Sequence, residues 1–118
     1  MFEKNLNIPY LLDFYGEVLS ERSRSILEMY YYNDLSLSEI AENEGISRQG
    51  VRHIIKKGEE ELFFLEERLG LASDFTEIQA VAKELISVSE RLSDHSDENV
   101  KNLAGKALKC AEMILSKN

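Results

Sequence analysis

The sequence predicts an all-α protein, and three observations support this fold class. First, apolar residues recur at spacings of three and four along most of the chain, which is the pattern of amphipathic helices. Second, serines that can cap helix N-termini precede several of these segments. Third, no segment of useful length alternates apolar and polar residues as a half-buried strand does. With 118 residues, 43% of them hydrophobic, the chain has the length of one domain and can bury a core.

Two helices are expected before residue 35. Pro9 suits the first turn of a helix, where its missing N–H has no partner to lose. The apolar residues that follow it at helical spacing are Leu11, Phe14, Tyr15, Val18 and Leu19. Ser20 can cap the second helix, and Asn33 with Asp34 ends it. The apolar side of this second helix consists of Ile26, Leu27, Tyr30 and Tyr31.

Two more helices are expected between Ser36 and Gly70. Ser36 and Glu39 have the spacing of a capping box at the start of a short helix. Gly45 fits the left-handed position that closes this helix. Ser47 can cap the next helix, which is expected to continue to Leu69 and to stop at Gly70.

The remainder of the chain, residues 71–118, is predicted to form a C-terminal helical hairpin. Asp74 and Glu77 are expected to cap its first helix, which carries the apolar residues Phe75, Ile78, Val81, Ala82, Leu85 and Leu92. The polar stretch from Ser93 to Asp97 is expected to form the turn. The second helix carries Val100, Leu103, Ala104, Ala107, Leu108, Ala111, Ile114 and Leu115. The hairpin is expected to pack on the preceding domain or on a dimer partner.

The segment from Ser36 to Lys56 has the features of a helix-turn-helix. Ala41 is small where two helices would cross closely, and Gly45, four residues later, permits the positive φ of the turn. Ile46 fills the space beneath the turn. Val51 and Ile54 then return at helical spacing to pack against the first helix. The complete pattern is Ile40, Ala41, Gly45, Ile46, Val51 and Ile54 with two serine caps. The sequence therefore predicts a helix-turn-helix domain over residues 1–70, with a long exit helix.

The charge distribution singles out the second helix of this motif. The chain has 14 basic and 22 acidic residues, a net charge of −8. The twelve residues from Ser47 to Gly58 hold four basic residues and no acid, so the other 106 carry a net charge of −12. On a helical wheel the apolar stripe is Val51, Ile54, Ile55, Gly58, Leu62, Leu65 and Leu69.

A basic face opposite such a stripe is typical of a helix that enters the major groove of DNA. Arginine and glutamine can make bidentate contacts to bases, while lysine and the capped N-terminus suit phosphates. The candidate nucleic-acid-binding residues are Ser47, Arg48, Gln49, Arg52, His53, Lys56 and Lys57. The alternative is a solvated helix face that happens to be basic.

Other kinds of site have little support in the sequence. There is no glycine-rich phosphate loop, nucleophile elbow or spaced carboxylate pair, so we expect no enzyme. His53 and His95 lie 42 residues apart without a cysteine nearby, so we expect no metal site and no cofactor. The single cysteine, Cys110, cannot form an internal disulfide, and no apolar run approaches the roughly 20 residues of a membrane span. A cytoplasmic protein without membrane insertion is expected.

Two resemblances extend this interpretation. The stretch from Leu19 to Leu62 resembles region 4 of sigma factors, with Leu-Ser-Glu-Arg-Ser-Arg-Ser-Ile-Leu-Glu-Met-Tyr-Tyr ahead of Leu-Ser-Leu-Ser-Glu-Ile-Ala-Glu. Further segments, residues 11–16, 27–31, 45–51 and 65–71, resemble the YlxM family along roughly its whole length. That family consists of small bacterial helix-turn-helix proteins encoded beside genes of the signal recognition particle. The resemblance implies a regulatory or accessory role in that pathway.

Two functional classes therefore remain at this point. The first is a nucleic-acid-binding regulator that reads DNA as a dimer or contacts a structured RNA, and the basic segment favours it. The second is a protein-interaction accessory of the signal recognition particle that keeps the helix-turn-helix as a scaffold. The net charge favours this second class, as do Glu44 and Gly50, which depart from the residue types usual in the motif. Phe63 and Phe64 project away from the apolar stripe and need cover, so a homodimer through the long helix or the C-terminal hairpin is predicted.

Overall fold

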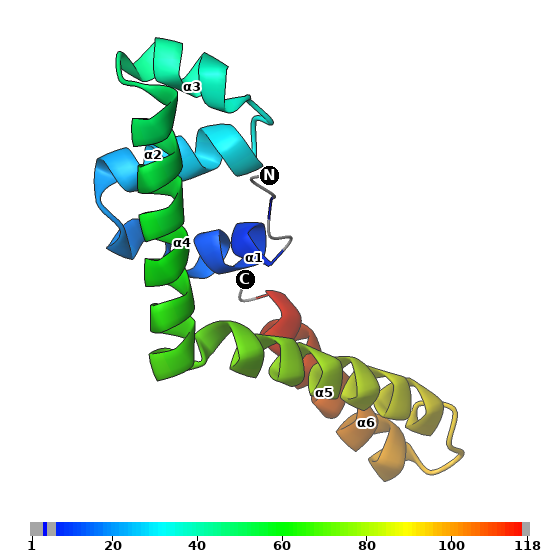
Figure 1. Cartoon of the computed structure of the whole chain (residues 1–118). Helices are drawn as coiled ribbons and strands as arrows, with labels where there is room; N and C mark the ends of the chain where they lie inside the picture. The colour runs from blue at the N-terminus through cyan, green and yellow to red at the C-terminus, as the bar shows by residue number, and fades with distance from the viewer. Residues whose placement is uncertain (1–3, 5–6, 117–118) are drawn as a thin grey trace. The chain divides into compact units, whose positions relative to one another are not determined.

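The computed structural model describes Lys4 and residues 7–116. This part of the chain contains six α-helices, one 3-10 turn and no strand, which confirms the predicted all-α class (Figure 1). The elements are α1 (Ile8–Tyr15), η1 (Gly16–Val18), α2 (Glu21–Tyr31), α3 (Leu37–Glu44), α4 (Arg48–Leu69), α5 (Leu71–Leu92) and α6 (Glu98–Ser116). They fall into two compact units, one ending at Ala72 and the other beginning at Ser73.

The predicted caps define the boundaries of three helices. The Oγ atoms of Ser20, Ser36 and Ser47 each accept a hydrogen bond from a backbone N–H three residues later, over 2.9–3.2 Å. Glu39 completes the capping box, because its carboxylate accepts the N–H of Ser36 at 3.0 Å. Gly45 and Gly70 end α3 and α4 with φ of 68° and 64°. The left-handed conformation is the one predicted for Gly45, and Gly70 is the predicted stop of α4. These boundaries follow from bonds between residues that are close in sequence.

The end of the first helix differs from the prediction. Regular α1 stops at Tyr15, and a single 3-10 turn follows in which the N–H of Leu19 bonds to the Gly16 carbonyl at 3.2 Å. Leu19 is then extended, with φ −70° and ψ 156°, and its side chain enters the core. Val18 consequently points outward and is 60% exposed. The prediction that Val18 continues the apolar side of this helix is wrong.

The core of the first unit forms where α1, α2 and α3 pack against α4. Its buried residues are Ile8, Leu11, Leu12, Tyr15, Leu19, Ile26, Leu27, Tyr30, Ile40, Ala41, Val51, Ile55, Leu62 and Ala72. Gly58 allows α2 to approach α4 closely, because a Cβ at this position would lie 2.7 Å from Cδ1 of Leu27. Within the stripe predicted on α4, the buried residues are Val51, Ile55, Gly58 and Leu62, and the half-buried residues are Ile54 and Leu65. Leu69 was predicted on the same stripe, but it lies at the last position of α4 and is 54% exposed.

The start of α5 is also different from the prediction. The helix begins at Leu71, directly after Gly70, and Asp74 lies within its first turn. The N–H of Leu71 donates to the Tyr15 hydroxyl, and the N–H of Ala72 donates to the Glu66 carboxylate, both at 3.0 Å. The Tyr15 hydroxyl in turn donates to Glu66 at 2.5 Å. Residues of α1 and α4 therefore cap α5, and the expected cap by Asp74 and Glu77 is wrong.

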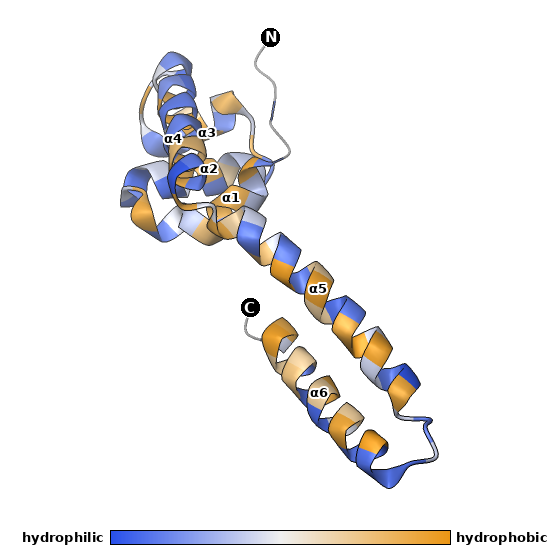
Figure 2. Ribbon diagram, turned by 90° about the horizontal axis from the view of Figure 1, so that it is seen from below, coloured by the Kyte–Doolittle hydropathy of each residue, from blue (hydrophilic) through white to orange (hydrophobic). Residues whose placement is uncertain are grey.

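In the second unit, α5 and α6 lie side by side and antiparallel, as the predicted hairpin requires (Figures 1 and 2). The turn between them falls within the predicted polar stretch, and Asp97 caps α6 by accepting the N–H of Asn99 at 2.8 Å. The buried positions of the hairpin are small residues, namely Ala82, Ser89, Ala104 and Ala111. None of the helices in the described part of the chain combines the length and the apolar character needed to cross a membrane.

Candidate nucleic-acid interface

The turn between α3 and α4 fixes the position of the basic helix. Gly45 takes the left-handed conformation, and the N–H of Ile46 then bonds back to the Ala41 carbonyl at 3.1 Å. Ile46 is half-buried against the core, where Ala41 and Val51 are fully or nearly buried. The turn is therefore held by backbone bonds on one side and by apolar contacts on the other. This arrangement sets the direction in which α4 leaves the turn.

Ser47 and Gly50 form the N-terminal cap of α4. The Gly50 N–H donates to Ser47 Oγ at 2.9 Å, and a Cβ on Gly50 would lie 3.3 Å from that same oxygen. Glycine at this position therefore leaves room for the serine cap. The remaining N–H groups of the first turn have no partner within the helix, as at any helix N-terminus, and they carry its partial positive charge.

All seven predicted site residues are exposed. Three of them come together, because Arg48, Gln49 and Arg52 line a surface hollow of about 460 Å³ with Leu37 of α3. Arg48 is also held across the turn, since its Nη1 donates to Ser38 Oγ at 3.2 Å. His53, Lys56 and Lys57 lie further along α4 and outside this hollow. The basic face thus has two parts. The residues nearest the turn line one hollow together, and His53, Lys56 and Lys57 are exposed outside it.

Leu37 and Ser38 are not among the predicted site residues. Both lie in the first turn of α3, ten or more residues before their neighbours on α4. No periodicity within one helix relates residues on opposite sides of a turn, so only the folded structure reveals them. A second serine shortly after the capping Ser36 is the one signal in the sequence that points to this position.

Both helices of the motif also carry acidic residues. Glu39 and Glu42 of α3 line a separate hollow with Leu35 and Asn43. The pKa of Glu39 is lowered by its hydrogen bonds with the backbone and the side chain of Ser36, so it carries its charge at neutral pH. On α4, burial raises the pKa of the Glu59 carboxyl, which accepts a hydrogen bond from the Tyr31 hydroxyl. Glu59, Glu60 and Glu61 directly follow the basic segment on α4.

Lys4 adds a further basic group near the motif, although its charge is paired. Its Nζ lies 2.5 Å from Oδ1 of Asp34 and 4.7 Å from the centroid of the Tyr30 ring. Burial raises the pKa of Tyr30, while the nearby charges of Lys4 and Arg52 oppose that rise. Lys4 therefore anchors the end of α2 and leaves the basic face to α4. Within the described part of the chain, no three His, Cys, Asp or Glu side chains gather as metal ligands would.

Comparison with known proteins agrees with this geometry. Residues 2–103 match the model of the family UPF0122, described as a putative helix-turn-helix protein, YlxM/p13-like. The chain belongs to the YlxM/p13-like family. A UPF0122 protein of Clostridium kluyveri (strain ATCC 8527) is 40% identical over 101 residues, which cover 86% of this chain and 89% of that protein. UPF0122 proteins of Bacillus cereus (strain AH187) and Bacillus anthracis (strain A0248) are each 42% identical over 103 residues. In both cases the match covers 85% of this chain and 94% of the other protein. The YlxM/p13-like match therefore includes the whole helix-turn-helix and ends within α6.

Proposed function

We propose that this YlxM/p13-like protein is a nucleic-acid-binding regulator that acts in the cytoplasm and is not an enzyme. The observation that carries the proposal is the hollow lined by Arg48, Gln49 and Arg52. These side chains lie at the start of the second helix of a helix-turn-helix, which is the part that enters the major groove in proteins of this type. The rest of the chain is strongly acidic, so a basic face confined to this position is best explained by a negatively charged ligand.

Each residue of the face has a chemical role in this proposal. Arg48 and Arg52 present planar guanidinium groups that can bind the major-groove edge of guanine, and Gln49 can bind that of adenine. The capped N-terminus at Ser47 suits a phosphate, as do the ammonium groups of Lys56 and Lys57. His53 is exposed between these groups and can contact either a base or a phosphate. Duplex DNA is the ligand that this geometry favours, and structured RNA is the other candidate.

A homodimer forms part of this proposal. Helix-turn-helix regulators commonly bind two half-sites about 34–36 Å apart, so each subunit needs to supply only a few contacts. A monomer with four basic residues on its reading face has a small footprint, whereas two copies double the number of phosphates neutralised.

The test is a gel shift with random-sequence duplex DNA and with a signal recognition particle RNA, at low and at near-physiological salt. The double variant Arg52→Glu with Lys56→Glu should abolish binding while leaving helicity and melting nearly unchanged, because both side chains are exposed. Lys83→Glu with Lys101→Glu is the matched control. It changes the net charge equally at exposed positions of the hairpin and should leave binding far less affected. If the Arg52/Lys56 variant binds every probe as well as the parent protein does, the basic face is not the site.

The second candidate function is a protein-interaction accessory of the signal recognition particle, with the helix-turn-helix as a scaffold. The acidic balance of the chain favours it, because a net charge of −12 outside the basic segment opposes contact with any nucleic acid. This candidate becomes the first choice if the gel shifts show no binding, or binding that the charge reversals do not change. A shift with the particle's RNA alone would instead indicate an RNA-binding accessory.

A further inference from the structure

The hairpin carries an uncovered apolar stripe on α5. Its side chains are 39–60% exposed, although all of them are large and aliphatic. They are Ile78, Val81, Leu85, Val88 and Leu92. Their spacings alternate strictly between three and four residues, which is the heptad pattern of helices that pack against other helices. Five exposed aliphatic side chains in one row form a contiguous apolar patch, and such patches mark surfaces that bind another protein segment or a ligand.

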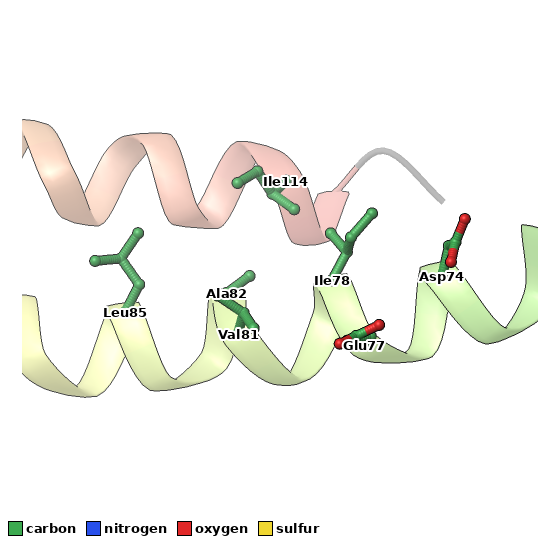
Figure 3. Close-up of a pocket in the computed structure, with 7 residues that line it drawn as sticks. All are labelled: Asp74, Glu77, Ile78, Val81, Ala82, Leu85 and Ile114. Carbon is green, nitrogen blue, oxygen red and sulfur yellow. The ribbon is translucent and has the colours of Figure 1, made fainter.

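The second helix continues the same face. Leu103, Cys110 and Ile114 of α6 are exposed, and Leu103 is 66% exposed. The buried small residues are Ala82 and Ser89 on α5 and Ala104 and Ala111 on α6. On a helical wheel viewed along each helix from its N-terminus, the exposed stripe lies roughly 90° from these buried residues, and the direction of rotation is the same on both helices. Because α5 and α6 are antiparallel, the same sense brings both stripes to the same side of the hairpin. In Figure 3 the side chains of Ile78 and Leu85 extend from α5 toward Ile114 of α6, across the groove that these residues line.

The groove between the helices measures about 380 Å³ and is mostly apolar. Its lining consists of Asp74, Glu77, Ile78, Val81, Ala82, Leu85 and Ile114. Hydropathy colouring of the ribbon shows hydrophobic residues along the length of both helices (Figure 2). Two helices that leave such a groove between them have only one layer of a packed structure, and stable helical folds have two.

We propose that this face is covered by the same face of a second copy of the chain, so that two hairpins form an antiparallel four-helix bundle. This surface is the one through which the homodimer proposed above would form. The inference rests on the proposed function only in assigning the dimer a role in nucleic-acid binding. The area of the face fits a dimer. A helix of 22 residues is about 33 Å long, and two helices side by side are about 20 Å wide. The resulting face is on the order of 650 Å², close to the ~800 Å² per partner of a standard stable interface.

The charges at the edges of the face favour a second copy and also define its orientation. Glu77 and Glu84 flank the stripe of α5 on its outer side, and Lys106 flanks that of α6. A two-fold axis parallel to the helices places α5 over α6 of the second copy, so that Glu84 approaches Lys106. An axis across the helices would place α5 over α5 and bring acidic edges together. Both arrangements make all neighbouring helices antiparallel, so the charges at the edges decide between them.

The exposed aromatic residues of α4 are a poorer dimer surface. The ring of Phe64 is already partly covered by the guanidinium of Arg68, whose central carbon lies 5.2 Å from the ring centroid. Glu60, Glu61 and Glu67 are exposed on the same helix. A two-fold axis through this surface would bring these acids close to their own copies, which is unfavourable. The hairpin offers more apolar area and opposite charges at its two edges.

Sedimentation equilibrium of the full chain without nucleic acid tests the proposal. The parent protein should sediment at twice 13.5 kDa at tens of micromolar. Val81→Glu places a charge in the centre of the face and should weaken the dimer at least about tenfold, a change of about 1.4 kcal/mol. Ser87→Glu is the matched control, because it adds the same charge at an exposed position on the other side of α5 and should leave the dimer intact. Val81 is 60% exposed, so helicity should be unchanged in both variants.

A charge exchange tests the orientation. Glu84→Lys alone and Lys106→Glu alone should each weaken the dimer, and the double variant should restore it. A failure of the double variant to restore the dimer overturns the placement of α5 over α6. A parent protein that is monomeric at these concentrations, or a dimer that Val81→Glu leaves intact, overturns the proposal itself. The Arg52/Lys56 variant should remain dimeric, so the nucleic-acid site and the dimer surface can fail independently.

Discussion

At the scale of single residues, Gly58 shows how one missing side chain permits a helix crossing. It lies in the middle of α4, where glycine is normally unfavourable by about 1 kcal/mol relative to alanine. The reason for its presence is Leu27 of α2, which is fully buried and would lie 2.7 Å from a new Cβ. Gly105 of α6 is a contrasting case, because a Cβ there would meet nothing within 4 Å. The two glycines therefore have opposite expected responses to the same substitution.

We expect Gly58→Ala to destabilise the protein by about 1–2 kcal/mol, since overpacking outweighs the gain in helix propensity. Gly105→Ala should instead stabilise it by about 0.5–1 kcal/mol, because only the propensity changes. Urea unfolding of both variants beside the parent protein measures the difference. A stabilising Gly58→Ala would show that the packing between α2 and α4 is looser than described.

Ser89 provides a second prediction at this scale. It is buried in the hairpin, and its hydroxyl has no hydrogen-bond partner in the described part of the chain. Ser89→Ala removes that unsatisfied hydroxyl and improves helix propensity, so we expect a stabilisation of about 1 kcal/mol. Thermal unfolding followed by circular dichroism checks this. A loss of stability would mean that the hydroxyl makes a contact which the substitution breaks.

At the scale of the elements, the helix-turn-helix depends on a close crossing of α3 and α4. Ala41 is nearly buried at this crossing, in the same cluster as Ile40 and Val51. A larger side chain at this position must push the two helices apart. The orientation of the basic face depends on the same contact, because α4 carries both the apolar stripe and the basic residues.

Ala41→Leu should therefore destabilise the protein by about 1–3 kcal/mol. The denaturant midpoint is the measurement, with Glu42→Leu as the control, because it adds the same side chain at an exposed position of α3. An unchanged midpoint for Ala41→Leu would contradict the helix-turn-helix packing described here.

The start of α5 is the second feature at this scale. Its first two N–H groups are capped by the Tyr15 hydroxyl and the Glu66 carboxylate, which lie in α1 and α4. Burial and the hydrogen bond to Glu66 raise the pKa of Tyr15, so the hydroxyl keeps its proton and donates it to Glu66. The cap thus depends on the fold of the first unit.

Tyr15→Phe should destabilise the protein by about 1–3 kcal/mol, because the N–H of Leu71 and the carboxylate of Glu66 each lose the part-buried hydroxyl as a partner. Hydrogen exchange should show faster exchange at Leu71 than in the parent protein. Tyr10→Phe is a useful comparison, since it removes the hydroxyl that donates to the Ala72 carbonyl from a more exposed side chain. Equal stability of the parent and Tyr15→Phe would rule out this cap.

At the scale of the whole molecule, the decisive property is the separation of charge. The net charge is −8, yet the first three turns of α4 carry four basic residues and no acid. Long-range repulsion from the acidic remainder is screened beyond about 8–10 Å near physiological salt, whereas contacts at the basic face are local. Binding to nucleic acid should therefore be weak and specific to one small surface.

The salt dependence follows from the same count. Arg48, Arg52, Lys56 and Lys57 can neutralise at most four phosphates per subunit, so the slope of log K against log salt should be no steeper than about −4 per subunit for duplex DNA. Fluorescence anisotropy with a labelled duplex over a range of salt concentrations measures it. A much steeper slope would mean that basic residues outside α4 also contact the nucleic acid.

The sequence by itself determined those features that depend on residues close together in the chain. The serine caps, the capping box and the two left-handed glycines all involve bonds over three to five residues, so their residue types and spacing were sufficient. The all-α class and the exposure of the basic face followed from periodicity for the same reason. The use of that face by a nucleic acid stays a prediction, because exposure and charge do not identify a ligand.

Only the tertiary structure decided the features that depend on residues far apart. Tyr15 caps α5 across 56 residues, so this helix begins at Leu71 and not after the expected cap at Asp74. Leu69 follows the buried periodicity of α4, but the helix extends beyond the residues that could cover it, so it is exposed. Arg48 meets Ser38 only because the turn brings α3 and α4 together. Local hydrogen bonds are specified by spacing along the chain, whereas burial and capping from a distance depend on which elements the fold brings into contact.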